Sequence, residues 1–507
     1  MSPTQFSALP ADILLQVVSY GLDIDDAFSL SMVSKYFHAL SAEHSFWLPP
    51  LQFSKISRPL PVPTVTDLRE YSSSALKKLA LHARRLTRNW AAPRPVVTGP
   101  IKSIPVGVHN SVLYCLPGTA SGAIVLYSLE DGTAVCLNTQ TGQFSSPTLL
   151  GRIHDMSSPI EQLDSYTVTV LVDNQKIVVL TASCSPNPQL RIICECDLEL
   201  GYQYTSVFMN SFCAGVVRAS LAAGSWLELQ TFSLENPMVS SIVVTDCPGY
   251  RTLGSAVVND AVFIVALQHR QAAVYACPRR LMAGSDSSSS ADNDIDFTLG
   301  RNHVGHIPSS SNSSTTSLTH FRDYCVLSTE PYSGRSTISV VRGYAPDSRV
   351  DTPNDVPLLR ALEITFWPRP NNGPEIQDAS PADYDAWEKG LHRKLLPAET
   401  ITVEGGLSMN EGNAWELLVI ANSGLAVLLL VDPPSNDEPG TDSFELRHPK
   451  LMLVRFDPVS HIASQHELVL PEEALNTRDI CAIALDDHLG VVILVTADDV
   501  LRIIPYA

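Results

Sequence analysis

From about Val96 onward the chain is a long series of short apolar runs separated by turn signals, and this pattern restricts the fold more than any other feature. Typical runs are GAIVLYSL, YTVTVLV, KIVVLTA and GVVILVT. Apolar runs of this length, bounded by Gly, Asn and Asp, predict β-strands. About two dozen such strands over roughly 400 residues, at about four strands per blade, predict a β-propeller of six to eight blades. Two β-sandwich domains are the structural alternative.

The propeller is expected to be degenerate, because neither Trp-Asp nor Gly-His recurs at regular intervals. Stretches rich in Ser, Pro, Asn and Asp interrupt the strands and are predicted to be surface loops. One of these loops is expected from Ser285 to Ser317, with His303 and His306 in solvent. The chain ends on the apolar run VLRIIPY, which needs a neighbouring strand. We expect this run to close the ring by pairing with SVLYCLPG or GAIVLYSL near the start of the domain.

In the first fifty residues, the apolar side chains recur at helical spacing instead. Pro10 suits a first helical position and Asp12 the positive end of the helix dipole. A second helix is expected to start near Asp25 or Asp26 and to run to Leu40. One more short turn should precede Trp47, and the two prolines that follow are expected to end the unit. A unit of about 40 residues seldom buries enough apolar surface to be stable alone, so another surface must cover it.

This segment, LPADILLQVVSYGLDIDDAFSLSMVSKYFHALSAEHSFW, resembles an F-box. Gly21 is an extra residue where the family usually runs directly from the aromatic to Leu-Asp. The resemblance implies docking onto the Skp-type adaptor of a cullin-RING ubiquitin ligase, with the rest of the chain selecting a client protein. The residues that it assigns to adaptor binding are Leu9, Pro10, Ile13, Leu14, Val17, Leu22, Leu30, Val33, Ser34, Phe37 and Trp47.

Residues 67–90 are predicted to form a basic amphipathic helix. Its apolar stripe consists of Leu76, Leu79, Ala80, Ala83 and Leu86. Such a helix can bind a membrane or a nucleic acid, but we favour a linker that packs its stripe on the F-box or on the body. The ending RLTRNW also resembles the segment after the F-box in many fungal F-box proteins. We therefore divide the chain into an F-box-like helical domain (5–50), a linker (51–95) and a propeller-like domain (96–507).

Charge and composition restrict the partners. Residues 101–507 carry 24 Lys and Arg against 46 Asp and Glu, so this part is a poor candidate for holding a phosphate backbone. The start has no secretion signal, and the longest apolar run, LAVLLLV, is too short to span a membrane. Ten scattered cysteines suit a reducing compartment. We expect a cytoplasmic or nuclear protein that binds neither nucleic acid nor membrane.

Catalytic and metal-binding motifs are incomplete. His466 and Glu467 resemble the start of a zinc-protease motif, but Leu470 stands where the second His is needed. Cys194 and Cys196 share one strand face without a second pair, which predicts core packing. We therefore expect no catalytic residue, no cofactor and no metal. The function predicted from the sequence is a client receptor in a ubiquitin ligase; an interaction scaffold and a propeller enzyme with an unrecognised site are the alternatives.

Overall fold

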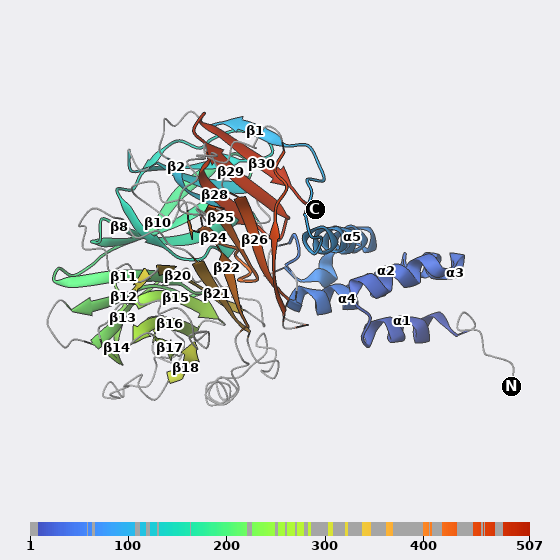
Figure 1. The fold of residues 1–507 in the computed structure, drawn as a ribbon, viewed down its shortest axis with the longest axis horizontal. Coiled ribbons are helices and arrows are strands. Elements are labelled where there is room, and N and C mark those ends of the chain that lie inside the picture. The colour runs from blue at the N-terminus through green and yellow to red at the C-terminus, as the bar shows by residue number, and fades with distance from the viewer. Residues whose placement is uncertain are drawn as a thin grey trace, which may run out of the picture.

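The computed structural model divides the chain into a helical N-terminal part and a β-rich body (Figure 1). None of its described helices is long and apolar enough to cross a lipid bilayer. The residues that the structure describes are 9–57, 59–62, 66–106, 112–117, 122–128, 131–162, 164–220, 226–248, 252–258, 261–268, 271–277, 282–284, 303–307, 320–322, 337–345, 361–368, 399–404, 406–407, 418–432, 450–457, 460, 462–471 and 480–507.

Residues 9–90 form one helical module. Its helices are α1 (Ala11–Ser19), α2 (Ile24–Val33), α3 (Lys35–Leu40), α4 (His44–Ser57), the 3-10 helix η2 (Leu68–Glu70) and α5 (Ser73–Trp90). One apolar core holds them together, with members from every helix of the module. The buried side chains of this core are Leu14, Val18, Ile24, Ala27, Phe37, Leu40, Phe46, Trp47, Leu51, Leu60, Val62, Leu68, Leu76, Ala80 and Ala83.

Two boundaries inside the module differ from the sequence prediction. The carboxylate of Asp23, rather than Asp25 or Asp26, caps α2 by accepting a hydrogen bond from Asp26 N at 2.8 Å. The second helix is also broken at Ser34, whose extended backbone separates α2 from α3. The Ser34 hydroxyl accepts a hydrogen bond from Phe37 N at 3.4 Å, so this residue starts a new helix.

The prediction that Pro49 and Pro50 end the helical unit is wrong, because α4 continues through both residues. Each interior proline costs about 3 kcal/mol through a lost hydrogen bond and a steric clash. Phe46, Trp47 and Leu51 are fully buried on either side of the prolines. Because burying each of these side chains contributes about 1.5–3 kcal/mol, packing offsets the local preference.

The strands form seven antiparallel sheets in the described part of the chain. The first three sheets are β2–β5 (Val112–Pro117, Ala123–Ser128, Thr133–Asn138, Thr148–Leu149), β6–β10 (Ile153–Met156, Ile160–Glu161, Ser165–Val172, Lys176–Ser183, Gln189–Asp197) and β11–β14 (Tyr202–Met209, Cys213–Ser220, Trp226–Ser233, Ser240–Pro248). The next two are β15–β18 (Thr252–Val258, Ala261–Gln268, Gln271–Cys277, His303–Ile307) and β19–β22 (His320–Arg322, Thr337–Ala345, Ala361–Pro368, Glu399–Glu404). The last two are β23–β27 (Gly406–Leu407, Leu418–Ile420, Ala426–Asp432, Lys450–Asp457, Ile462–Glu467) and β28–β30 (Ile480–Asp486, Val491–Thr496, Val500–Pro505) completed by β1 (Lys102–Pro105).

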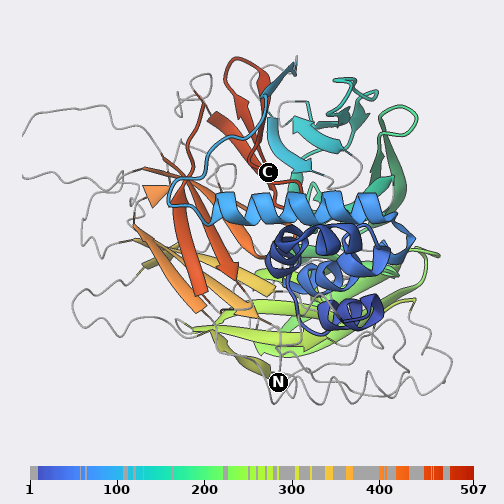
Figure 2. The ribbon, with the colours of Figure 1, turned by 90° about the vertical axis from the view of Figure 1, so that its right-hand side faces the viewer.

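The sheets follow one another around a ring in chain order, as in a β-propeller (Figure 2). The first strands of the sheets lie side by side: β2 contacts β28, β6 contacts β11, and β11 contacts β15. In the described part of the chain, separate apolar clusters fill the boundary between the first and second sheets, between the second and third, and between the sixth and seventh. The body is therefore propeller-like rather than a pair of sandwiches.

The two ends of the ring meet in one sheet, as expected from the apolar C-terminal strand. β30 pairs antiparallel with β1 in the register Ile104↔Leu501. Thr98 N donates to Pro505 O at 3.0 Å and Val106 N donates to Asp499 O at 2.8 Å, which extends the pairing at both ends. The expected partners are corrected, because β30 pairs with residues 102–105 and not with β2 or β3.

The expected loop from Ser285 to Ser317 contains a strand. His303 and His306 lie on β18, which pairs with β17 in the register Ala273↔His306 and Tyr275↔His303. The prediction that both histidines belong to a loop is therefore wrong, since the β17 edge supplies backbone partners that sequence composition does not reveal. The rest of that interval lies outside the described residues.

Candidate functional site

The helical module carries exposed apolar side chains on the three helices that point away from the ring (Figure 1). On α1 and its end, Ile13, Val17 and Tyr20 follow one another at helical spacing and are all exposed. At the junction of α2 and α3, Met32 and Val33 are 67% and 69% exposed, and Tyr36 is also exposed. We call these six residues the exposed apolar patch. Large apolar side chains gathered on a small module are typical of a protein interface.

The patch is distinct from the core of the same helices. Leu14 is 1% exposed, whereas its neighbour Ile13 is 41% exposed. Trp47 is fully buried, and its indole Nε1 donates a hydrogen bond to Ser41 O at 2.7 Å. The Trp47 ring also packs edge-on against Phe46, with 5.1 Å between ring centroids. The core is thus filled without the side chains of the patch, and these side chains are free to contact another molecule.

The structure divides the eleven residues that the F-box resemblance assigns to adaptor binding. Pro10, Ile13, Val17 and Val33 are exposed, while Leu9, Leu22, Leu30 and Ser34 are half-buried. Leu14, Phe37 and Trp47 lie in the core, where they cannot contact a partner directly. Their expected role is corrected: these three hold the helices in the arrangement that presents the patch.

Sequence reasoning did not select Tyr20, Met32 or Tyr36. The available signal was the helical period, since Tyr20 follows Val17 by three residues and Ile13 by seven. Gly21, the extra residue of the motif, has φ 149° and ends this helical segment in a conformation that side chains rarely adopt. It places Tyr20, 80% exposed, at the turn between α1 and α2.

Helix α5 joins the helical module to the ring. Its first half packs on α1–α4 through Leu76, Ala80 and Ala83. Its last turns enter the core of the ring through Leu86 and Trp90. The apolar stripe of this amphipathic helix is therefore shared between the F-box-like helices and the body.

Charges on α5 fix its position on α2. Arg84 Nε and Arg88 donate hydrogen bonds to the same oxygen of Asp25, at 2.8 and 2.9 Å. The Arg84 guanidinium also lies 3.8 Å from the centre of the Phe28 ring. These two arginine side chains thus contact the helical module.

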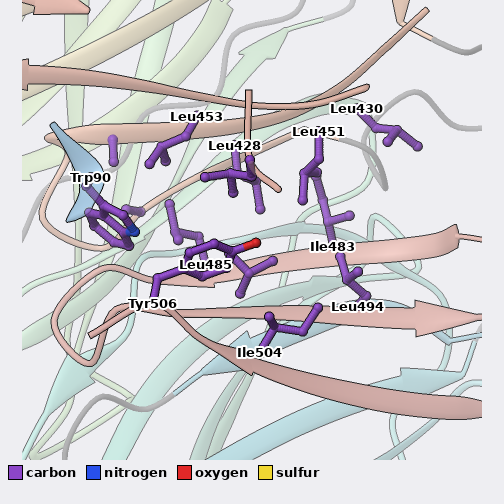
Figure 3. Close-up of a cluster of buried hydrophobic side chains, with 14 of the residues drawn as sticks. Trp90, Leu428, Leu430, Leu451, Leu453, Ile483, Leu485, Leu494, Ile504 and Tyr506 are labelled. Atoms are coloured by element: carbon purple, nitrogen blue, oxygen red, sulfur yellow. The ribbon is translucent and has the colours of Figure 1, made fainter. Parts of the chain in front are cut away.

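On the ring, α5 meets the β28–β29 turn and the C-terminus. We call this contact between α5 and the ring the joint. Trp90 lies at one end of an apolar cluster with Tyr506, Leu453 and Leu485 (Figure 3). The amide of Asn89 donates to Val96 O and to Tyr506 O, both at 2.7 Å. A contact between helix and ring that is both apolar and hydrogen-bonded is typical of a fixed orientation.

Two histidines add polar contacts to the joint. His488 Nδ1 donates to Leu60 O at 2.8 Å, and His82 Nε2 donates to His488 O at 3.3 Å. Burial lowers the pKa of His82, which favours its neutral form. In the turn between β28 and β29, the carboxylate of Asp486 accepts hydrogen bonds from His488 N and Leu489 N. Burial raises the pKa of Asp486 to about 7.

The joint lies on one face of the ring and leaves the other face uncovered by the module (Figure 1). Strand direction alternates, so the turns after the first and third strands of a sheet share one face and the remaining turns share the opposite face. The β28–β29 turn and the end of β30 belong to the module's face. The opposite face includes residues 173–175, 198–201 and 497–499, and Leu200 there is 86% exposed. We call this the open face.

Among the described residues, no group of three or more His, Cys, Asp or Glu side chains is arranged to hold a metal ion. Cys194 and Cys196 lie on β10 and are half-buried and buried, respectively. His466, from the incomplete zinc motif, lies on β27, where burial lowers its pKa.

Comparison with known proteins gives a family match for the N-terminal helices. Residues 6–50 match the F-box-like family model. No curated protein matches the chain. Similar solved structures include the WD40 domain of SCAP from fission yeast (10% identity, 80% of this chain and 98% of that chain, TM-score 0.34) and the β-propeller domain of Cps50 (Swd1) from Myceliophteria thermophila (11%, 78% and 96%, TM-score 0.39). Hydrazine synthase of Kuenenia stuttgartiensis is similar at 8% identity over 80% of this chain and 97% of that chain, with TM-score 0.40.

Proposed function

We propose that this chain is an F-box substrate receptor of a cullin-RING ubiquitin ligase. The exposed apolar patch docks a Skp-type adaptor and through it a cullin, and the ring binds a client protein. The observation that carries this proposal is the patch itself: six apolar side chains remain exposed on a module whose own core is complete. The F-box-like match over the same helices names the kind of partner.

The seven sheets are, in this proposal, the blades of one closed propeller that acts without a catalytic residue or cofactor. The receptor works in the cytoplasm, the nucleus or both. Its client binds on the open face, because the helical module occupies the other face around the β28–β29 turn. The joint at α5 then holds client and adaptor at a fixed separation, which is what transfer of ubiquitin between bound proteins requires.

A scaffold whose helices fold back entirely on their own body is the alternative from another class. The contacts of α5 and Leu60 with the ring agree with part of that idea. It gives no reason, however, for the exposed side chains of Val33 and Tyr20. Adaptor binding separates the two functions.

The test is calorimetric titration of the purified chain with a purified Skp-type adaptor. The double variant Ile13→Asp and Val17→Asp should bind at least a hundredfold more weakly, because two apolar contacts together contribute about 3 kcal/mol or more. Leu200→Asp is the matched control, since it places the same charge on an exposed apolar residue of the open face. The proposal fails if the native chain binds no adaptor, or if the control weakens binding as much as the double variant.

A further inference from the structure

Two cysteines from neighbouring sheets lie side by side in the body. Cys136 is in the middle of β4, and Cys184 follows the last residue of β9. Both belong to the apolar cluster between the β2–β5 and β6–β10 sheets. Cys136 is fully buried, and Cys184 is 8% exposed. Neither residue has a place in adaptor or client binding as proposed above.

The contacts of the two sulfur atoms are reciprocal. Cys136 Sγ donates to the carbonyl of Ser183, the residue before Cys184, over 3.6 Å. Cys184 Sγ lies 3.8 Å from the carbonyl of Leu137, the residue after Cys136. The two thiols also lie close enough to shift each other's pKa. Such placement brings the sulfur atoms together from two sheets and requires no unfolding for them to meet.

We propose that Cys136 and Cys184 form an oxidant-sensitive dithiol site, which a hydroperoxide converts to a disulfide linking the β2–β5 and β6–β10 sheets. The site takes a small hydroperoxide as its reactant. It is independent of the F-box and of any client, and in a reducing compartment it is expected to remain a dithiol until peroxide is present.

Cys184 is the residue that reacts first. It is the more exposed of the two, and the neighbouring Cys136 thiol lowers its pKa. Cys184 in turn raises the pKa of Cys136, which therefore keeps its proton. A thiolate is the reactive form of cysteine, so the pair has one nucleophile and one resolving thiol.

The reaction balances with hydrogen peroxide as the oxidant. The Cys184 thiol first releases its proton, the thiolate attacks one peroxide oxygen, the O–O bond breaks, and the departing hydroxide takes up the released proton to form water. The product is a Cys184 sulfenic acid. The sulfur of Cys136 then attacks the Cys184 sulfur, the S–O bond breaks, and the hydroxyl leaves with the Cys136 proton as a second water. Two thiols thus lose two electrons and two protons to the peroxide.

The experiment is disulfide mapping of the intact chain after treatment with hydrogen peroxide, alkylation and trypsin digestion without reduction. Cleavage after Lys and Arg isolates Cys184 in peptide 177–191, places Cys136 with Cys115 in peptide 103–152, and places Cys194, Cys196 and Cys213 in peptide 192–218. We expect 177–191 linked to 103–152, with the loss of two hydrogen masses, and release of the link by dithiothreitol.

Variants assign the bond within that pair of peptides. Cys136→Ser should abolish the link, whereas Cys115→Ser and Cys194→Ser should leave it unchanged. Because the native chain is mapped directly, a variant that fails to fold does not remove the test. The proposal is overturned if 177–191 of the oxidised native chain remains unlinked, or if it links to 192–218.

Discussion

Ile13 and Leu14 are neighbours in α1, yet they face opposite surroundings. Successive residues of a helix point about 100° apart, so one turn of α1 presents Leu14 to the core and Ile13 to solvent. The same division separates Trp47 and Phe37 in the core from Val33 on the surface. The direction of each side chain thus decides whether a residue of the motif stabilises the module or can contact the adaptor.

Alanine at the two neighbours should therefore give opposite results. Leu14→Ala should lower the free energy of unfolding of the module by about 2–5 kcal/mol, because it leaves a cavity in the core. Ile13→Ala should change it by less than about 1 kcal/mol but weaken adaptor binding. Urea denaturation followed by hydrogen exchange of the module helices, beside calorimetric titration, measures both. Equal stability losses would mean that Ile13 is also a core residue.

Asp486 should make stability depend on pH. Burial raises its folded pKa to about 7, so between pH 4 and 7 the unfolded chain releases a proton that the folded chain retains. The unfolded state then binds fewer protons, and stability falls as pH rises through this window, by at most roughly 4 kcal/mol. Asp486→Asn can still accept from His488 N and Leu489 N. Thermal melts from pH 4 to 8 should show a smaller decline for this variant; an unchanged decline would assign the effect to other groups.

At the scale of elements, α5 carries the connection between module and ring. Leu86 and the β28–β29 turn meet so closely that a Cβ on Gly490 would lie 2.3 Å from Leu86 Cδ1. The φ angle of Gly490 is +68°, which also favours glycine. The position thus combines a backbone requirement with a packing requirement.

Gly490→Ala tests the packing part, and Gly142→Ala is its matched control. Gly142 has φ +72° but no atom within 4 Å of the added Cβ, so both variants carry similar backbone strain. We expect Gly490→Ala to cost about 1–3 kcal/mol more, because the buried Leu86 must move. Hydrogen exchange of α5 should rise in Gly490→Ala only. Equal effects of the two variants would show that α5 does not press on this turn.

Helices and strands could be predicted from the sequence where the pattern of neighbouring residues determines them. The apolar period of α5 and the apolar end of the chain predicted the amphipathic helix and the closure of the ring, and both are confirmed. The partner of β30 was predicted wrongly, because pairing across about 400 residues is not contained in either strand alone. The continuation of α4 through Pro49 was missed for a related reason: it depends on the burial of Phe46 and Leu51 by other helices. Which residues of the F-box motif are exposed could also not be predicted without the folded module.

The whole molecule is held closed by β30, which lies between β29 and β1. Deleting residues 498–507 removes both neighbours' hydrogen bonds and the apolar contacts of Ile504 and Tyr506. The entire body should therefore lose stability cooperatively, whereas a frayed terminus would affect only its own surroundings. Hydrogen exchange of β3, in the first sheet, should accelerate in the truncated chain. Unchanged protection of β3 would contradict a ring closed by β1 and β30.

The proposed receptor function depends on the exposed apolar patch of the helical module and on an open face that stays free. Hydrogen exchange of the full-length chain, with and without a purified Skp-type adaptor, tests this most directly. The account predicts new protection of residues 11–20 and 30–37, with no change in residues 173–175 and 198–201 of the open face. No protection of the helices at a saturating adaptor concentration, or protection of the open-face turns instead, would contradict it.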